Sequence, residues 1–175
     1  MNIRLDENFF RRDCLVVAPE LVGKILVRKL PDGTLIRERI SETEAYRGEE
    51  DKACHASKGK TNRTEVMYGE SGKIYVYLCY GIHWLMNIVT GGAGEPQCVL
   101  IRAGEVHNGP AKITKYLRID GTFNKKSVCG NPEIWFEDDG FRPVIKTASR
   151  VGIDYAGDYW KNIEWRFIAS GGVSM

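Results

Sequence analysis

Several short segments rich in β-branched and aromatic residues follow one another along the chain, and most are separated only by brief turns. The clearest is KIYVYLCY at residues 73–80, which Gly81 separates from a second strand-like segment at residues 82–90. Two strands joined by a short turn run antiparallel, because a parallel connection needs a crossover of a dozen or more residues. The pattern therefore predicts a mostly antiparallel sheet.

The remaining strands follow from the same composition. They are predicted at residues 25–30, 34–46, 98–103, 134–136, 144–146 and 163–168. A Pro-Asp-Gly turn at 31–33 joins the first two, and an Asp-Asp-Gly turn at 138–140 joins the strands at 134–136 and 144–146.

Short helices are predicted beside this sheet. Asp6 is a candidate N-cap for a helix through Phe10, and residues 110–117 begin at a proline, which the first turn of a helix tolerates. A one-turn helix is predicted at 19–23, between a proline and a glycine. The 175 residues are near the size of one domain. We expect an α+β fold: a single domain over 1–175, with a curved, mostly antiparallel β-sheet flanked by short helices.

Composition excludes several classes of protein. The chain is 43% hydrophobic and 27% charged, which is ordinary for a packed protein and argues against a disordered tail, a coiled coil or a collagen. No run of about 18 apolar residues occurs, so we expect no membrane association. The first residues carry acids (Asp6, Glu7) where a secretory signal is basic and then apolar. We therefore expect an intracellular protein, and its small size favours a monomer.

The cysteines and histidines do not form a metal-binding motif. The five cysteines (Cys14, Cys54, Cys79, Cys98 and Cys129) are odd in number and not closely paired, so we expect reduced thiols. His55 has no second histidine at metal-ligand spacing, although a triad with His83 and Asp51 is the disfavoured alternative. We expect no metal and no cofactor.

Charge is unevenly distributed along the chain. Residues 42–51 hold five acids against one base, whereas residues 112–126 hold five bases against one acid, and Lys58, Lys60 and Arg63 lie between these segments. Basic segments around an acidic pocket suit an enzyme that binds a polyanion and keeps a carboxylate for chemistry. For any single cluster, solvated surface charge is the alternative.

The segment ETEAY at 42–46 ends a predicted strand beside a long polar connection at 47–71. Alternation places Glu42, Glu44 and Tyr46 on one face of the strand. A solvent-facing acid pair is the simpler interpretation, but a carboxylate beside an aromatic ring also suits a hydrolase. Glu44 is the better candidate base, since it lies nearest Tyr46 and the long connection, and neighbouring acids are expected to raise its pKa.

Aromatic residues are dense just downstream. Tyr75 and Tyr77 share a face of the predicted strand, and Tyr80 comes at its end, where Gly81 allows a sharp turn. Such tyrosines either pack against neighbouring strands or stack on nucleobases, which is worth about 1–3 kcal/mol per base. Composition does not choose between these two interpretations.

Five motifs in a fixed order make the pattern specific. They are ETEAY at 42–46, Asp51 and His55 in the following loop, YVYLCYG at 75–81 with Met86-Asn87, VLIRA at 99–103, and GPAKITK at 109–115. Together they resemble the alkyladenine type of 3-methyladenine DNA glycosylase, over about residues 14–167. The resemblance implies excision of alkylated or deaminated purines from double-stranded DNA by hydrolysis of the N-glycosidic bond, with water rather than a lysine as nucleophile.

The resemblance also implies roles for individual residues. Glu44 would deprotonate a bound water, and Arg102 would help to hold that water or the carboxylate. The residues implied to bind the extruded purine are Tyr46, His55 and Tyr77, with Asn87 crowding the 2-amino group of normal guanine. Tyr80 would fill the gap left in the duplex, and Lys112 and Lys115 would contact phosphates.

Two rival functions remain open from the residues alone. A non-enzymatic single-strand nucleic-acid-binding module could use the tyrosine strand and basic loops without any particular carboxylate. A carbohydrate glycosidase could use Glu42 and Glu44 as its acid pair, since residues i and i+2 on a strand lie roughly 7 Å apart.

Overall fold

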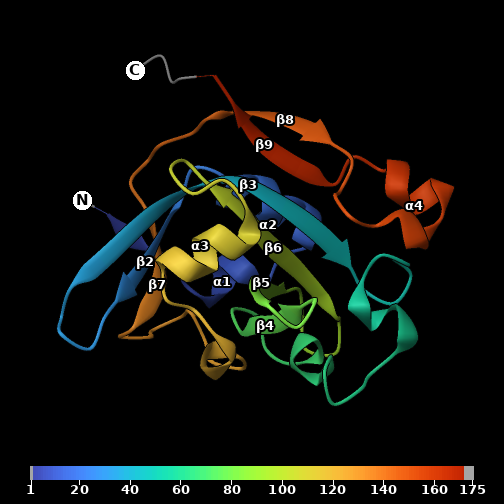
Figure 1. Ribbon diagram of the computed structural model, residues 1–175, viewed down its shortest axis with the longest axis horizontal. Coiled ribbons are helices and arrows are strands. Elements are labelled where there is room, and N and C mark those ends of the chain that lie inside the picture. Colours follow the sequence, from blue (N-terminus) through green and yellow to red (C-terminus); the bar gives the residue numbers. More distant parts are fainter. Residues whose placement is uncertain (1, 172–175) are drawn as a thin grey trace.

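The structure is a computed structural model that describes residues 2–171 (Figure 1). Residue 1 and residues 172–175 of the predicted 1–175 domain lie outside the described residues. Within residues 2–171 the chain forms an open sheet of nine strands whose pairings are all antiparallel, with a few short helices. The predicted α+β class and antiparallel sheet are confirmed.

The strands and helices have the following bounds. The strands are β1 (Ile3–Arg4), β2 (Ile25–Lys29), β3 (Leu35–Arg47), β4 (Ile74–Cys79), β5 (His83–Thr90), β6 (Gln97–Gly104), β7 (Ile134–Asp138), β8 (Val144–Ala148) and β9 (Arg166–Ser170). The helices are α1 (Glu7–Phe10), α2 (Cys14–Leu21), α3 (Pro110–Tyr116) and α4 (Asp158–Asn162), and 3₁₀ turns occur at His55–Lys58, Glu65–Tyr68, Gly121–Phe123 and Asp154–Ala156.

Strand β3 is the longest strand and connects the two parts of the sheet. The strand order is β1-β7-β2-β3-β6-β5-β4, and β9 pairs with both β3 and β8. The first half of β3 pairs with β2, and its second half pairs with β6 after a register shift between Ile40 and Thr43. A bulge of this kind bends a strand and increases its twist. Figure 1 shows β3 crossing the molecule with the β8–β9 hairpin beside it.

The helix predicted at 19–23 is wrong in its position. The chain instead forms α2, and the side chain of Asp13 caps its start by accepting a hydrogen bond from the Leu15 N–H at 2.8 Å. Pro19 lies inside the last turn of this helix rather than at its start. The cap and an apolar face buried against the sheet set the position of the helix, so the proline does not mark where it begins.

The strands β7 and β8 do not pair with each other, although a turn at 138–140 joins them in sequence. Strand β7 pairs with β1 and β2, whereas β8 pairs only with β9. The turn acids form ion pairs with distant strands and loops: Asp138 contacts Lys24 at 3.0 Å, and Asp139 contacts Arg39 at 2.6 Å. The predicted strand at 163–168 also begins later, at Arg166, after the unpredicted helix α4.

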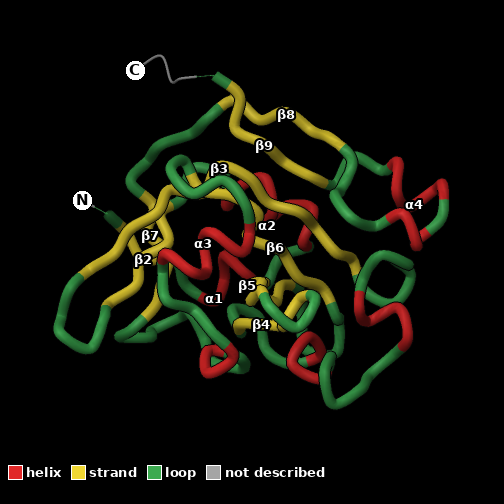
Figure 2. Tube along the Cα trace, viewed as in Figure 1, coloured by secondary structure: helices red, strands yellow, loops and turns green. Residues whose placement is uncertain are grey.

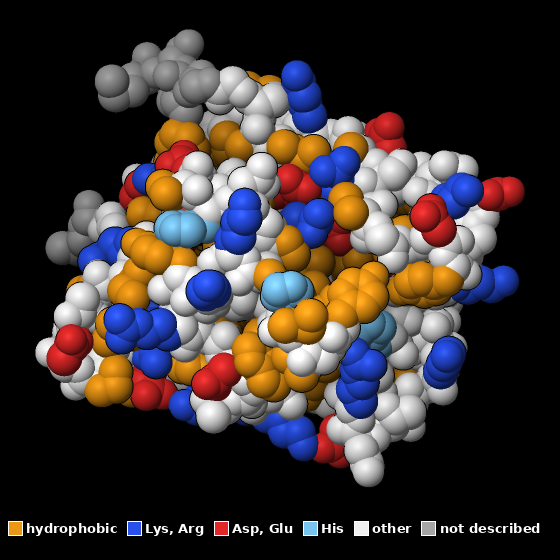
Figure 3. Space-filling view, viewed as in Figure 1, with side chains coloured by type: hydrophobic (Ala, Val, Ile, Leu, Met, Phe, Trp, Pro, Cys, Tyr) orange, Lys and Arg blue, Asp and Glu red, His pale blue; other side chains and the backbone are white. Residues whose placement is uncertain are grey.

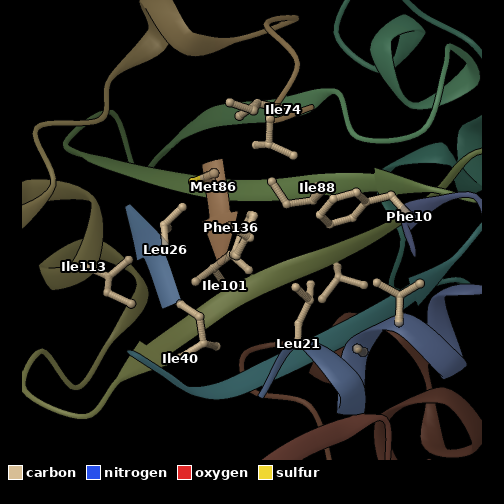
Figure 4. Close-up of a cluster of buried hydrophobic side chains, with 14 of the residues drawn as sticks. Phe10, Leu21, Leu26, Ile40, Ile74, Met86, Ile88, Ile101, Ile113 and Phe136 are labelled. Carbon is tan, nitrogen blue, oxygen red and sulfur yellow. The ribbon is translucent and has the colours of Figure 1, made fainter. Parts of the chain in front are cut away.

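One large apolar cluster holds the sheet and helices together. Figure 4 shows ten labelled members of it, contributed by both strands and helices, with their side chains gathered together: Phe10, Leu21, Leu26, Ile40, Ile74, Met86, Ile88, Ile101, Ile113 and Phe136. Burial of each such side chain contributes about 1.5–3 kcal/mol. Among residues 2–171, no helix combines the length and apolar character needed to cross a membrane.

A second cluster fixes the long connection between β3 and β4. Figure 2 shows this connection as loop interrupted by short helical turns. Ala56, Val66 and Met67 from the connection are buried against Tyr75 of β4 and Val89 of β5. The connection is therefore a packed wall beside the ends of β3 and β4, which is where the candidate site lies.

Candidate active site

A cavity of about 590 Å³ opens beside the carboxyl-terminal half of β3, which is within the usual size range for a small-molecule site. Strands β3 to β6, the 47–71 connection, the start of α3 and the segment after β8 all contribute to its lining. The predicted residues that line it are Glu44, Tyr46, His55, Tyr77, Tyr80, Asn87 and Arg102. Figure 3 shows hydrophobic and histidine side chains gathered on this face among Lys and Arg side chains.

Glu44 is the one carboxylate lining the described cavity, and its side chain is only 1% exposed. Its Oε2 accepts a hydrogen bond from the Tyr46 hydroxyl at 2.7 Å, and its Oε1 accepts one from the Val151 N–H at 2.8 Å. The Arg102 Nε lies 3.4 Å from the same Oε1. Each carboxylate oxygen can accept two hydrogen bonds, so Glu44 keeps capacity for a further donor.

Burial raises the pKa of Glu44 above its ordinary value. The hydrogen bonds from Tyr46 and Val151 and the charges of Arg102 and Arg150 oppose this rise. The direction matches the sequence prediction, but the main cause is removal of the carboxylate from water rather than repulsion by neighbouring acids. Burial and the nearby carboxylate also raise the pKa of Tyr46, which keeps its hydroxyl a donor at neutral pH.

Glu42 occupies a different environment from Glu44. Its Oε1 accepts a hydrogen bond from Arg166 Nη1 at 2.9 Å and lies 3.5 Å from Arg102 Nε. Glu42 is not among the residues that line the cavity. The two acids therefore do not face a common substrate space, which disfavours the carbohydrate glycosidase alternative.

Aromatic rings form one wall of the cavity. The His55 and Tyr77 rings meet edge to face with centroids 4.7 Å apart, and the Tyr75 and Tyr77 rings lie 5.4 Å apart. The His55 Nδ1 is 2.7 Å from the Tyr75 hydroxyl, which orients the imidazole. Burial lowers the pKa of His55 to about 4, with a contribution from the charge of Arg63, so the ring is neutral at neutral pH.

Asn87 lies in the cavity lining on β5, opposite Tyr75 of β4. Its Nδ2 donates to the Tyr75 carbonyl at 3.2 Å, and the Cys98 Sγ lies 3.8 Å from its Oδ1. The side chain is buried and held by both amide atoms. It therefore presents a fixed steric boundary to anything that enters the cavity.

Tyr80 lies at the tip of the β4–β5 hairpin and is 89% exposed. Tyr80 and Gly81 have φ angles of 51° and 68°, and the Ile82 N–H donates to the Cys79 carbonyl at 3.1 Å. Two successive positive φ angles at the centre of such a turn are typical of type I′, in which a tyrosine is unusual. The turn therefore projects an aromatic ring into solvent at the edge of the cavity.

Lys112 and Lys115 lie on α3 and are both exposed. Neither lines the cavity, but Pro110 and Ala111 at the start of the same helix do. The helix thus places the two lysines on the surface, on the same short helix whose first residues line the cavity.

Sequence analysis did not anticipate the contribution of the segment after β8. Val151 is 107 residues from Glu44 in sequence, and Tyr155 from the same segment lines the cavity and donates to the Ala53 carbonyl at 2.9 Å. Every residue except proline has a main-chain N–H, so a main-chain donor requires no particular residue type and no motif could have indicated Val151. Arg63 also lines the cavity, although its sequence context marked it only as a basic residue.

Asp51 and Arg150 form an ion pair whose side chains are fully buried. Arg150 donates from Nη1 to Oδ2 at 2.5 Å and from Nη2 to Oδ1 at 2.9 Å, and its guanidinium lies 4.8 Å from the centroid of the Tyr46 ring. Asp51 is therefore already occupied and is not available for the metal triad with His55 and His83. In the part of the chain that the structure describes, no group of three potential metal ligands is present.

Comparison with known proteins identifies the family. The sequence profile described as methylpurine-DNA glycosylase matches residues 8–109 and 104–172. A relative from Psychrobacter cryohalolentis is 44% identical over 86% of this chain and 85% of its own, and one from Desulfitobacterium hafniense is 42% identical over 94% of both. Each is named "Putative 3-methyladenine DNA glycosylase". These matches support a DNA glycosylase of base-excision repair.

A third relative, from Methanocella arvoryzae, is 42% identical over 93% of this chain and 90% of its own. The chain belongs to the methylpurine-DNA glycosylase family. The resemblance inferred from the five ordered motifs is confirmed.

Proposed function

We propose that this chain, acting as a single domain, is a monofunctional 3-methyladenine DNA glycosylase that removes alkylated or deaminated purines from double-stranded DNA. Its substrates would be of the 3-methyladenine, 7-methylguanine and hypoxanthine class, and its product an abasic site. The observation that carries the proposal is Glu44, a buried carboxylate with free acceptor capacity in an aromatic cavity of about 590 Å³.

The damaged nucleotide must first leave the base stack, because the glycosidic bond is inaccessible within the duplex. Extrusion costs a few kcal/mol, and less for a damaged or mismatched base. The exposed ring of Tyr80, fixed at the tip of a tight hairpin, can enter the stack and replace the lost contacts. Lys112 and Lys115 would contact the phosphates that flank this position.

Glu44 then acts as general base toward a water molecule. The water oxygen forms a bond to C1′ of the deoxyribose while the C1′–N9 bond breaks, the purine keeps that electron pair, and Glu44 takes the proton. Arg102, 3.4 Å from Oε1, keeps the carboxylate oriented. General-base assistance of this kind typically supplies about 10²–10⁴-fold of rate. In the proposed reaction water displaces the purine directly, without a covalent lysine adduct.

The aromatic wall accounts for the choice of base. Alkylation at N3 or N7 makes the purine a cation that leaves readily and is attracted to the faces of tyrosine rings such as Tyr77. His55 is neutral at neutral pH and so does not repel such a base. Asn87, held by both of its amide atoms, would collide with the 2-amino group of an undamaged guanine.

The test is release of free bases from methylated duplex DNA by the wild type and by Glu44→Gln, resolved by chromatography. We expect the wild type to release 3-methyladenine and Glu44→Gln to lose about 100-fold or more of the rate while still binding the DNA. Glu42→Gln is the comparison variant, because Glu42 is an acid on the same strand that also lies near Arg102 but does not line the cavity, so it should lose much less of the rate than Glu44→Gln.

Other outcomes would point to the rival functions. Binding of DNA without release by the wild type would favour a non-enzymatic module. Equal release by the wild type and Glu44→Gln would keep the class of enzyme and remove Glu44 as its base. A covalent complex trapped by borohydride would contradict direct hydrolysis.

A further inference from the structure

Arg63 differs from the other arginine that lines the cavity. Arg102 lies between two carboxylates, at 3.5 Å from Glu42 and 3.4 Å from Glu44. Arg63 forms no ion pair with a carboxylate of residues 2–171, and its guanidinium lies instead 5.2 Å from the centroid of the Tyr77 ring. The aromatic wall of the cavity therefore carries a positive charge without a counter-charge beside it.

The charge of Arg63 acts on the neighbouring groups of this wall. It contributes to the lowered pKa of His55 and opposes the rise in the pKa of Tyr75. Both rings belong to the surface on which an extruded purine would stack. A positive charge that affects these groups must also act on a charged ligand at the same distance.

We propose that Arg63 is a specificity-determining residue that lowers the preference of the cavity for positively charged purines relative to neutral ones. The inference rests on the proposed function. An N3- or N7-alkylated purine is a cation and meets a like charge at Arg63, whereas hypoxanthine is neutral and does not.

Competition for the Tyr77 ring acts in the same direction. The electron-rich face of a tyrosine attracts one cation at a time, and the Arg63 guanidinium already lies near that ring. A cationic purine must displace or share it, while a neutral purine gains little from the ring quadrupole and loses little to the arginine. Arg63 thus broadens the range of bases toward neutral, deaminated purines.

The experiment compares two bases in single-turnover reactions: 3-methyladenine from methylated duplex DNA and hypoxanthine from a duplex with one deoxyinosine. Arg63→Met removes the charge while keeping a long side chain, and Arg63→Lys keeps the charge. We expect Arg63→Met to raise the ratio of the 3-methyladenine rate to the hypoxanthine rate by about threefold or more. Arg63→Lys should keep a ratio close to that of the wild type.

Lys60→Met is the matched control for a nearby exposed cation. Lys60 lies 5.9 Å from the centroid of the Tyr68 ring and does not line the cavity, so its removal should leave the ratio unchanged. An equal fall of both rates in Arg63→Met would overturn the proposal and indicate a phosphate contact. An unchanged ratio with unchanged rates would overturn it as well. A wild type that releases neither base would contradict the proposed function itself.

Discussion

Burial raises the pKa of Glu44, and four interactions of its carboxylate oppose this rise. The titration of Glu44 should therefore be visible in the pH dependence of the rate of base release. Because the ionised form of Glu44 is the base in the proposed mechanism, activity is expected to rise as pH rises through the raised pKa of Glu44. Arg102→Met removes a positive charge that lowers this pKa, so the acidic limb of the rate profile should move to higher pH. Single-turnover base release across a pH series measures this. A limb at the same pH in both proteins would show that Arg102 does not act on the titrating group.

The same burial has a consequence for stability. The pKa of Glu44 is higher in the folded than in the unfolded state, so its stabilising contribution is present at low pH and is lost as pH rises through the folded pKa. Glu44→Gln should therefore unfold at a higher denaturant concentration than the wild type at neutral pH. The difference should narrow toward acidic pH, and a constant difference across the series would contradict the argument.

At the scale of elements, the tip of the β4–β5 hairpin holds a solvent-exposed aromatic residue in a strained backbone conformation. Tyr80 adopts a φ of 51° although it is not a glycine, which costs about 1–2 kcal/mol for most residues. Asparagine tolerates this conformation better, and Tyr80 is 89% exposed and so loses little packing. Tyr80→Asn should therefore raise the free energy of unfolding by about 1 kcal/mol while lowering base release from duplex DNA.

Tyr80→Ala is the comparison that separates these two effects. Alanine removes the ring without relieving the positive φ, so it should lower base release without a gain in stability. Chemical denaturation of both variants measures the effect of the positive φ on stability, and base release by both variants measures the effect of the aromatic ring on activity. A Tyr80→Asn variant that is no more stable than Tyr80→Ala would show that the turn is not strained.

At the scale of the molecule, the buried ion pair of Asp51 and Arg150 joins the loop at residues 47–71 to the segment that follows β8. Asp51→Asn leaves a buried guanidinium without its counter-charge, which should destabilise the fold by about 3–5 kcal/mol. Arg150 precedes Val151, the donor to Glu44, so the activity of the folded fraction should fall as well. Denaturant unfolding and single-turnover release measure the two effects.

A double variant tests whether the pair acts as a unit. Asp51→Asn with Arg150→Met removes both charges, and its destabilisation should be smaller than the sum of the two single effects. Strict additivity would mean that the two residues stabilise the fold independently. Equal activity in all variants would separate the pair from the positioning of Glu44.

Much of the site could be predicted because it depends on local alternation. Glu44 and Tyr46 are two residues apart on one strand, so their side chains share a face, which allows the hydrogen bond found between them. The same reasoning correctly placed Tyr75 beside Tyr77. The sharp turn that Gly81 allows was also predicted, and Tyr80 lies exposed at that turn.

Other features could not be predicted from the sequence because they depend on contacts between segments that are distant in sequence. A proline at position 19 predicts a helix that begins there, whereas capping by Asp13 and packing on β3 place the start of α2 at Cys14. The β7–β8 turn resembled a hairpin, yet β2 and β9 offered each strand a different partner. Turn residues report where a chain bends and not which strand it meets next.

The primary structure alone was enough to establish the family and the antiparallel sheet and to propose Glu44 as the candidate base, because each inference rests on residue types at short spacing. Folding in three dimensions added the burial that raises the pKa of Glu44, the Val151 donor and the unpaired charge of Arg63 beside Tyr77. These properties depend on the distance to water and to residues far along the chain. The pattern of residues within a short segment does not determine how far a side chain lies from water or from residues distant in the sequence.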